Sequence, residues 1–116
     1  MKIKCPIAHA SEFLGTKWSL ELTYYLQERR RFCELQEIMG DLNPATLSQR
    51  LKTLEANGIV DRKVIPDGQR HVEYGLTPKG EDLLKVFQEL IAWSSRWYPE
   101  DVVEGQGEGA STRGHQ

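Results

Sequence analysis

Cysteine is scarce in this sequence, whose 116 residues hold only Cys5 and Cys33. So few cysteines cannot form the disulfide scaffold of a small secreted protein, and in a reducing compartment they are usually thiols. No apolar run approaches the roughly 20 residues of a membrane span. The first residues, 1–6, also lack the apolar core of a signal peptide. We therefore expect a cytoplasmic protein without membrane association.

Patterns typical of catalytic and metal sites are also missing. The histidines His9, His71 and His115 are scattered, no metal-ligand spacing occurs, and there is no glycine-rich phosphate loop. The best enzymatic alternative is a thiol enzyme that uses Cys5 with His9, which requires this stretch to be helical. We expect no enzymatic activity, no metal and no cofactor.

The overall composition, with 39% hydrophobic and 28% charged residues, is typical of a soluble globular domain. The charge, however, is distributed unevenly along the chain. Residues 1–98 carry 14 Lys and Arg and 13 Asp and Glu, which gives a net charge of +1. Residues 99–116 carry one Arg and four Asp and Glu, which gives a net charge of −3. The final segment is rich in Gly and poor in large apolar residues. We therefore predict one domain over residues 1–98 and a disordered acidic tail over 99–116.

The most informative segment runs from Asn43 to Gly58. Pro44 suits the first turn of a helix, Asn43 before it is a plausible N-cap, and Gly58 suits the left-handed position after a helix. Three leucines at helical spacing, Leu47, Leu51 and Leu54, define a buried face. The opposite arc is small, polar and basic and contains no acid, which lets a helix approach base edges and phosphates. An ordinary solvated helix face is the alternative. The arc consists of Ala45, Ser48, Gln49, Lys52, Thr53 and Ala56.

The rest of the chain supplies the context for this helix. Asp67-Gly68 between two β-rich runs is a strong hairpin signal. Arg29 to Arg31 is expected to be a basic link, and Thr16 and Thr77 are expected to cap the helices that follow them. The fold class is therefore mainly α with a small β-hairpin wing, a winged helix-turn-helix of order α-α-α-α-β-β-α. The expected helices span 8–14, 17–27, 33–39, 44–57 and 78–98, and the strands span 59–65 and 71–76.

Several short motifs stand in a fixed order along the chain. They are Cys5-Pro6, Leu14-Gly-Thr-Lys-Trp18, Arg31-Phe-Cys-Glu-Leu35, Leu47-Ser-Gln-Arg-Leu-Lys-Thr-Leu54, Asn57-Gly-Ile-Val60 and Val72-Glu-Tyr-Gly-Leu-Thr-Pro-Lys-Gly80. In this order and spacing, the chain resembles the HxlR-type winged helix-turn-helix regulators, relatives of the MarR group, over residues 5–97. The resemblance implies a DNA-binding transcription factor that forms a homodimer, usually through its first and last helices.

The sequence departs from the family pattern at three positions. Thr16 replaces the second glycine of Gly-Gly-Lys-Trp, a mild change. Cys33 stands where a Ser-like residue usually opens the third helix, so a good N-cap is exchanged for a poor one. His71, with Arg70 beside it, stands where an Arg usually precedes Val-Glu-Tyr. The wing therefore offers a histidine where the family usually has an arginine for the minor groove.

The recognition helix should enter the major groove with its N-terminal half leading. Gln49 matches an adenine edge and Arg50 a guanine, although Arg50 has an alternative use as a partner of Glu55 or Asp61. Lys52 should bind a phosphate. For Trp18, next to Lys17, core packing is the favoured alternative to a phosphate site. The expected DNA-contacting residues are Lys17, Thr46, Ser48, Gln49, Arg50, Lys52, Thr53, Arg70 and His71.

The last helix carries more aromatic surface than a small domain needs. We predict that Trp93 and Trp97 belong to a dimer interface, because aromatic residues are enriched at such contacts. Packing against the first helix within one chain is the alternative.

Either cysteine is a candidate redox sensor. The family resemblance implies that Cys5 reacts with oxidants or electrophiles. Cys33 should gain thiolate character at a helix start beside three arginines. Inert thiols are the alternative for both. A winged helix that only binds protein is the second rival class, but it would not need the positive charge that remains at Arg50, Lys52, Arg62, Lys63 and Arg70.

Overall fold

The structure, a computed structural model, describes residues 5–102, without the side chains of Asp67, Gln69, Arg70, Asp101 and Val102. Most of the predicted acidic tail, residues 103–116, lies outside the described part. The chain divides into two compact units, residues 1–82 and 83–116. Each unit is described by itself.

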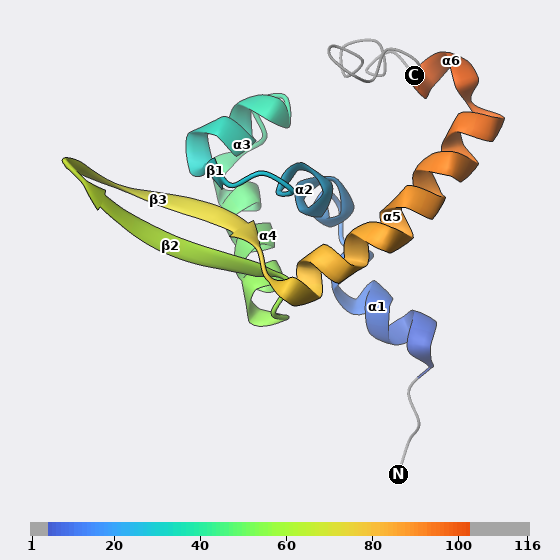
Figure 1. The fold of residues 1–116 in the computed structure, drawn as a ribbon, viewed down its shortest axis with the longest axis horizontal. Helices are drawn as coiled ribbons and strands as arrows, with labels where there is room; N and C mark the ends of the chain where they lie inside the picture. The colour runs from blue at the N-terminus through green and yellow to red at the C-terminus, as the bar shows by residue number, and fades with distance from the viewer. Residues whose placement is uncertain (1–4, 103–116) are drawn as a thin grey trace. The chain divides into compact units, whose positions relative to one another are not determined.

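The elements follow the predicted winged helix-turn-helix order, with two additions (Figure 1). The additions are a short strand before the third helix and a single helical turn at the end. The elements are α1 Pro6–Leu14, α2 Ser19–Tyr25, β1 Arg30–Arg31, α3 Phe32–Ile38, α4 Pro44–Ala56, β2 Val60–Asp67, β3 Gln69–Leu76, α5 Pro78–Trp97 and α6 Pro99–Val102.

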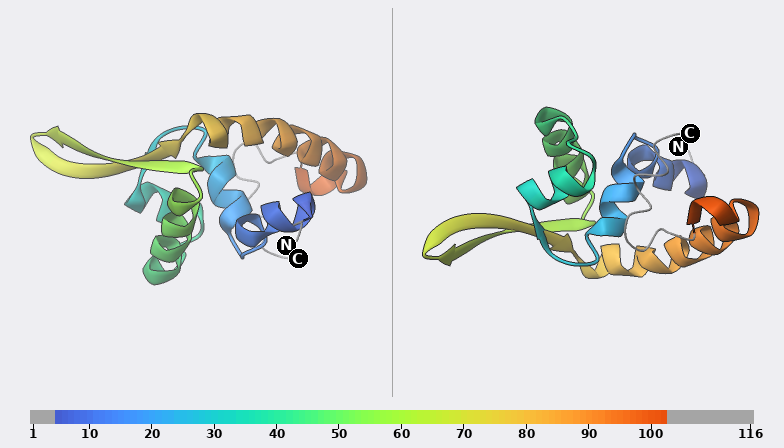
Figure 2. Two further views of the ribbon diagram at one scale, coloured as in Figure 1. Left: turned by 90° about the horizontal axis from the view of Figure 1, so that it is seen from below. Right: turned by 90° about the horizontal axis from the view of Figure 1, so that it is seen from above.

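The sheet has three antiparallel strands in the order β1-β3-β2. β2 and β3 pair from Val60↔Leu76 to Asp67↔Gln69, so the strands are longer than expected and only Gly68, with φ +82°, separates them. The hairpin projects as a long ribbon away from α2, α3 and α4 (Figure 2). The structure thus confirms the predicted wing and extends it.

β1 was not expected. Arg30 and Arg31, predicted to be part of a basic link, pair with Tyr74 and Glu73 of β3. A strand of two residues is too short to show the alternation from which strands are predicted. The pairing exists because β3 offers a free edge at this point, which is a property of the tertiary structure.

The core of unit 1 is built around the predicted leucine face of α4. All three leucines of that face are at most 2% exposed. This burial confirms the helical spacing from which the face was predicted. The buried hydrophobic residues of unit 1 are Phe13, Leu22, Leu26, Leu35, Leu47, Leu51, Leu54, Ile59 and Val60.

The helix-turn-helix pair is fixed by its capping residues. Asn43 accepts from the N–H of Ala45 at 2.8 Å, as predicted for an N-cap. Gly58, with φ +75°, ends α4, and the N–H of Ile59 donates to the Leu54 carbonyl at 2.9 Å. This bond and the one from Gly58 to Glu55 are those of a Schellman motif, which satisfies carbonyls at a helix end. The two ends of α4 are therefore set by residues next to them in the sequence.

α2 begins later than predicted. The expected helix 17–27 begins only at Ser19, because Trp18 adopts a left-handed φ of +80° that interrupts the helix, and it ends at Tyr25. Thr16 does not cap α2. Its hydroxyl donates to the Phe13 carbonyl at 2.8 Å and lies 2.6 Å from the Ser19 hydroxyl. The core position favoured for Trp18 is also wrong, since its side chain is only half-buried.

α3 begins one residue earlier than predicted. Its N-cap is Arg31 rather than Cys33, which is the second helical residue. Glu34 accepts from the backbone N–H of Arg31 at 2.8 Å. The first turn therefore has a capping acceptor, and a poor N-cap residue costs little here.

α5 has the predicted start. The Thr77 hydroxyl accepts from the N–H of Gly80 at 3.1 Å, and Pro78 occupies the first helical position. After α5, residues Pro99–Val102 form α6, although they belong to the tail that was predicted to be disordered. Proline at a first helical position followed by acidic residues favours a helical turn, which explains the difference. Among the described helices, none is long and apolar enough to cross a membrane.

Candidate nucleic-acid interface

The arc of α4 opposite its leucines is accessible, as predicted. Gln49, Lys52 and the alanines Ala45 and Ala56 are exposed. The predicted hydroxyl residues, Thr46, Ser48 and Thr53, are half-buried along the flanks of this arc. The arc therefore presents amide, hydroxyl and ammonium groups beside two small side chains. Such a surface can approach both base edges and phosphates.

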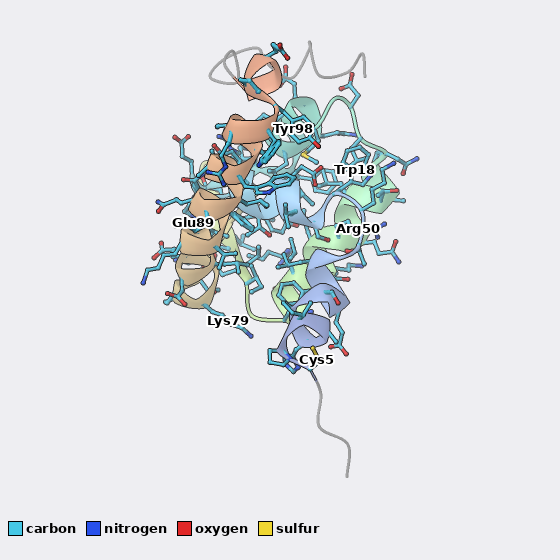
Figure 3. The ribbon with its side chains drawn as sticks, turned by 90° about the vertical axis from the view of Figure 1, so that its right-hand side faces the viewer. Cys5, Trp18, Arg50, Lys79, Glu89 and Tyr98 are labelled. Atoms are coloured by element: carbon cyan, nitrogen blue, oxygen red, sulfur yellow. The ribbon has the colours of Figure 1, made fainter. Side chains whose placement is uncertain are left out.

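Arg50 lies on the side of α4 that faces the turn with Trp18 (Figure 3). Its Nε donates to the backbone carbonyl of Lys17 at 2.7 Å, and its Nη1 donates to Oε1 of Gln49 at 3.3 Å. Neither acid considered as a partner, Glu55 or Asp61, pairs with Arg50 in the described part of the chain. In the structure, Arg50 thus has a structural role other than a base contact, since it binds a backbone carbonyl of the α1–α2 turn.

Lys17 does not sit in the first turn of α2 but two residues before it. Its Nζ lies 4.9 Å from the centre of the Trp18 ring, within the range of a cation–π contact. The Lys17 side chain remains exposed. Lys17 therefore contributes both a positive charge at this turn and the backbone carbonyl that accepts from Arg50 of α4.

His71 is held by an acid on the same strand. Its Nε2 lies 3.1 Å from Oε2 of Glu73, and only 18% of its side chain is exposed. Arg70 is placed in β3 by its backbone, but its side chain lies outside the described part. On β2, Arg62 and Lys63 are exposed, so further cationic side chains line the wing.

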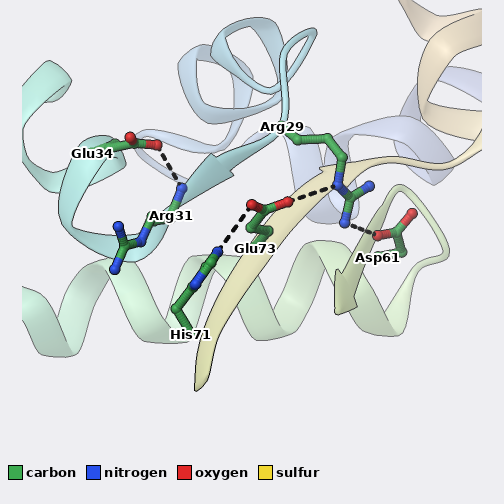
Figure 4. A network of polar contacts seen from close by, with 6 residues as sticks. All are labelled: Arg29, Arg31, Glu34, Asp61, His71 and Glu73. Carbon is green, nitrogen blue, oxygen red and sulfur yellow. Dashed lines mark hydrogen bonds and ion pairs between the residues drawn. The ribbon is translucent and has the colours of Figure 1, made fainter. Parts of the chain in front are cut away.

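Arg29 anchors the base of the wing, a role that was not predicted (Figure 4). Its Nη2 lies 2.8 Å from Oδ1 of Asp61, and its Nε lies 3.5 Å from Oε1 of Glu73. The hydrogen bond to Asp61 is the main cause that raises the pKa of Arg29 above its ordinary value. Gly75 makes room for this side chain, since a Cβ there would collide with Nη1. The only sequence signal is the complementary charge at positions 29, 61 and 73.

Cys5 is exposed and is the N-cap residue of α1 (Figure 3). No hydrogen bond of ordinary geometry joins its sulfur to the first turn. The backbone N–H groups of Ala8 and then Ile7 nevertheless lower the pKa of the thiol, since they favour the thiolate. One turn further, the N–H of His9 donates to the Cys5 carbonyl. Within residues 5–102, no three His, Cys, Asp and Glu side chains cluster closely enough to hold a metal ion.

Cys33 is also exposed. Two of the three arginines near it in sequence have partners elsewhere. Arg29 pairs with Asp61, and Arg30 donates to the Tyr25 carbonyl at 2.9 Å. The charge argument for Cys33 is therefore weaker in the structure than in the sequence.

Unit 2 exposes a large apolar surface. Trp93 and Trp97 are 47% and 65% exposed, and the Trp93 ring meets Tyr98 edge-on at 5.9 Å. Leu90 and Ile91 of the same helix are also exposed. In the described part of unit 2, only Phe87 is a buried hydrophobic residue. An apolar face of this kind is typical of an interaction site.

Comparison with known proteins places these features in a family. The family model of the HxlR-like helix-turn-helix matches residues 13–102. An uncharacterized HTH-type transcriptional regulator of Halalkalibacterium halodurans is 40% identical over 90 residues, covering 76% of this chain and 80% of the relative. The HTH-type transcriptional regulator YodB of Bacillus subtilis is 38% identical over 102 residues, covering 85% of this chain and 91% of YodB.

Solved structures agree with this assignment. The reduced form of YodB from B. subtilis matches with a TM-score of 0.73 and 37% identity, covering 83% of this chain and 96% of the other. YodB also matches in quinone-bound and diamide-treated forms, with TM-scores of 0.68 and 0.65. The redox regulator HypR in its oxidized form matches with a TM-score of 0.73 and 31% identity, covering 79% of this chain and 96% of HypR. With its winged helix-turn-helix and its matching motifs, the chain belongs to the HxlR-like helix-turn-helix family of transcriptional regulators.

Proposed function

We propose that this protein is a cytoplasmic, homodimeric regulator, not an enzyme, that binds specific DNA sequences and responds to oxidants or electrophiles through Cys5. The observation that carries the proposal is the exposed arc of α4. Behind it, three leucines are fully packed, and in front it presents Gln49 and Lys52 without an acid. A helix that is packed against the core on one face and carries polar, small and basic side chains on the other suits the major groove.

The proposed contacts divide by chemistry. Gln49 reads an adenine edge, since its amide both donates and accepts. Lys52 binds a phosphate and so adds affinity without sequence preference. Outside α4, Lys17 and the wing residues Arg70 and His71 add contacts to the DNA backbone or the minor groove. For His71 this requires that it leave Glu73 or act together with it. Thr46, Ser48 and Thr53 complete the proposed surface.

The proposed dimer rests on the apolar face of unit 2. Regulators of this family bind DNA and act as dimers. In this chain, Trp93 and Trp97 are exposed beside Leu90 and Ile91, a group of side chains that a second copy would remove from water. Pairing through α1 and α5 would place two copies of α4 to meet two half-sites of DNA.

The proposed thiol response rests on Cys5. Its sulfur is exposed and its pKa is lowered, the two conditions for a reactive thiol. The similarity to the redox regulator HypR, and to YodB in quinone-bound and diamide-treated forms, supports the same chemistry here.

The decisive experiment is a selection of genomic DNA fragments with the purified protein. The selected site is then titrated at two salt concentrations, with and without diamide. We expect a motif with two-fold symmetry, two chains per site, and affinity that falls steeply with salt. A flat salt response or binding by one chain would contradict the DNA-binding dimer. Equal binding with and without diamide would contradict only the thiol response and would leave the DNA-binding dimer standing.

A further inference from the structure

Arg50 joins the recognition helix to a turn that lies 33 residues earlier in the chain. The bond from its Nε to the Lys17 carbonyl is short, at 2.7 Å, and the side chain is half-buried. The same guanidinium reaches Gln49 through Nη1 at 3.3 Å. A single side chain thus contacts both the α1–α2 turn and the residue proposed to read DNA.

The α1–α2 turn is itself firmly attached to the end of α1. The Thr16 hydroxyl donates to the carbonyl of Phe13, a core residue, and lies 2.6 Å from the Ser19 hydroxyl. The N–H of Ser19 donates to the Thr16 carbonyl at 3.2 Å. Between these residues, Trp18 has a left-handed backbone. A turn with so many internal bonds offers the Arg50 side chain a fixed acceptor.

The contact with Gln49 determines how its amide is oriented. A guanidinium has only donors, so Gln49 must turn its Oε1 toward Arg50. The Nε2 group of Gln49 then points away from Arg50. Without this contact, an exposed glutamine has several rotamers and either amide orientation at similar energy. Arg50 therefore reduces the freedom of the side chain that reads the base.

We propose that Arg50 is a positioning residue, which fixes Gln49 for base recognition and holds α4 against the α1–α2 turn, rather than a residue that reads a guanine itself. This inference rests on the proposed DNA-binding function. The two roles of Arg50 differ in which base they affect. A residue that reads DNA directly carries a preference at a base of its own. A positioning residue carries the preference of its partner, Gln49.

The test compares the DNA motifs selected by the wild type, Arg50→Met, Gln49→Ala and the double variant. Methionine keeps an apolar stem but removes every donor. Lys52→Met is the matched control on the same helix. We expect Arg50→Met to lose about tenfold in preference at the base that Gln49→Ala also affects. We expect no further loss of preference in the double variant. Lys52→Met should weaken binding to all sequences alike.

A folding measurement and a substitute variant make the outcome decisive. Far-UV circular dichroism confirms that each variant is folded. If Arg50→Met is not folded, Arg50→Lys takes its place, since the lysine ammonium can still donate to the Lys17 carbonyl but lacks the planar fork with which the guanidinium forms both bonds. Relaxed preference at a separate base, with additive losses in the double variant, would overturn the positioning role alone. Failure of the wild type to bind any DNA would instead overturn the proposed function, and this inference with it.

Discussion

Arg29 and Asp61, 32 residues apart in sequence, are joined by a hydrogen bond of 2.8 Å from Nη2 to Oδ1. The same guanidinium reaches Glu73 on the neighbouring strand, where the carboxylate also contacts His71. The link between α2 and α3 is thereby tied to both strands of the wing at its base. We infer that this arrangement helps to orient the hairpin.

Replacing Arg29 with methionine should affect DNA binding more than stability. Both side chains of the ion pair are about one-third exposed, so its loss should lower the free energy of unfolding by no more than about 1 kcal/mol. Affinity for all DNA sequences should fall, because a less well-oriented wing loses contacts. Urea denaturation and DNA titration measure the two effects. Arg31→Met, an exposed arginine two residues further along the chain, is the control. A large stability loss with unchanged DNA affinity would refute a role in orienting the wing.

The ion pair of Arg29 should not make the fold sensitive to pH in the neutral range. Its folded-state pKa is raised, so its contribution is fully present below the pKa of the unfolded chain and is lost only as the pH rises through the higher folded value. That range is strongly alkaline.

Gly80→Ala should destabilise the protein, although alanine normally favours a helix. A Cβ on Gly80 would collide with the backbone carbonyl oxygen of Ile59, which is fixed in the core. We expect the free energy of unfolding to fall by about 1–3 kcal/mol, as for other overpacked sites. In an exposed helix the same change would raise stability by up to about 1 kcal/mol. Thermal unfolding decides between them, and a higher melting temperature would show that the collision is relieved.

Gln49→Ala and Lys52→Ala should separate sequence preference from general affinity. Gln49→Ala should cost about 1–3 kcal/mol on the preferred site and relax the base preference there. Lys52→Ala should weaken binding to all sequences and lower the salt slope by about 1. Titration against the selected site and a scrambled duplex measures both. An unchanged motif for Gln49→Ala would mean that another residue of α4 reads the base.

Replacing Trp93 and Trp97 with glutamine should weaken the dimer without unfolding α5. Both rings are exposed in the single chain, so their loss removes little packing within it. Analytical ultracentrifugation should show more monomer, while far-UV circular dichroism stays unchanged. Val64→Thr, an exposed apolar position on the wing, serves as the control. A dimer of full strength in the double variant would place the interface elsewhere, with α1 as the next candidate.

Cys5 should react at lower pH in the folded chain than in the unfolded chain. In a Cys33→Ser background, the midpoint of the alkylation rate should lie below that measured in urea, because the N–H groups at the start of α1 favour the thiolate. The corresponding stability is present above the unfolded-state pKa and is lost as the pH falls through the folded-state value. Equal midpoints would show that the helix start does not activate this thiol.

The role of the thiols is tested by DNA binding before and after diamide. We expect the affinity of the wild type and of Cys33→Ser to change and that of Cys5→Ser to stay constant. A response that disappears only in Cys33→Ser would assign the sensor to the second cysteine, which is also exposed.

Local patterns in the sequence determined most of the architecture. The leucine spacing of α4, its cap at Asn43 and its end at Gly58 are written in neighbouring residues, and the structure has all three. The Asp-Gly hairpin and the cap of α5 at Thr77 follow for the same reason. Such signals need only a few adjacent residues, because helix ends and tight turns are governed by local backbone conformation and hydrogen bonds.

Tertiary structure alone decided the partners of the charged side chains. Nothing in the sequence shows that Arg50 binds the Lys17 carbonyl, or that Arg29 lies between Asp61 and Glu73. A long cationic side chain can reach several acceptors at similar energy. The choice among them depends on which segments the folded core brings within about 3 Å. The two-residue strand β1 follows the same principle, because it exists only where β3 offers an open edge.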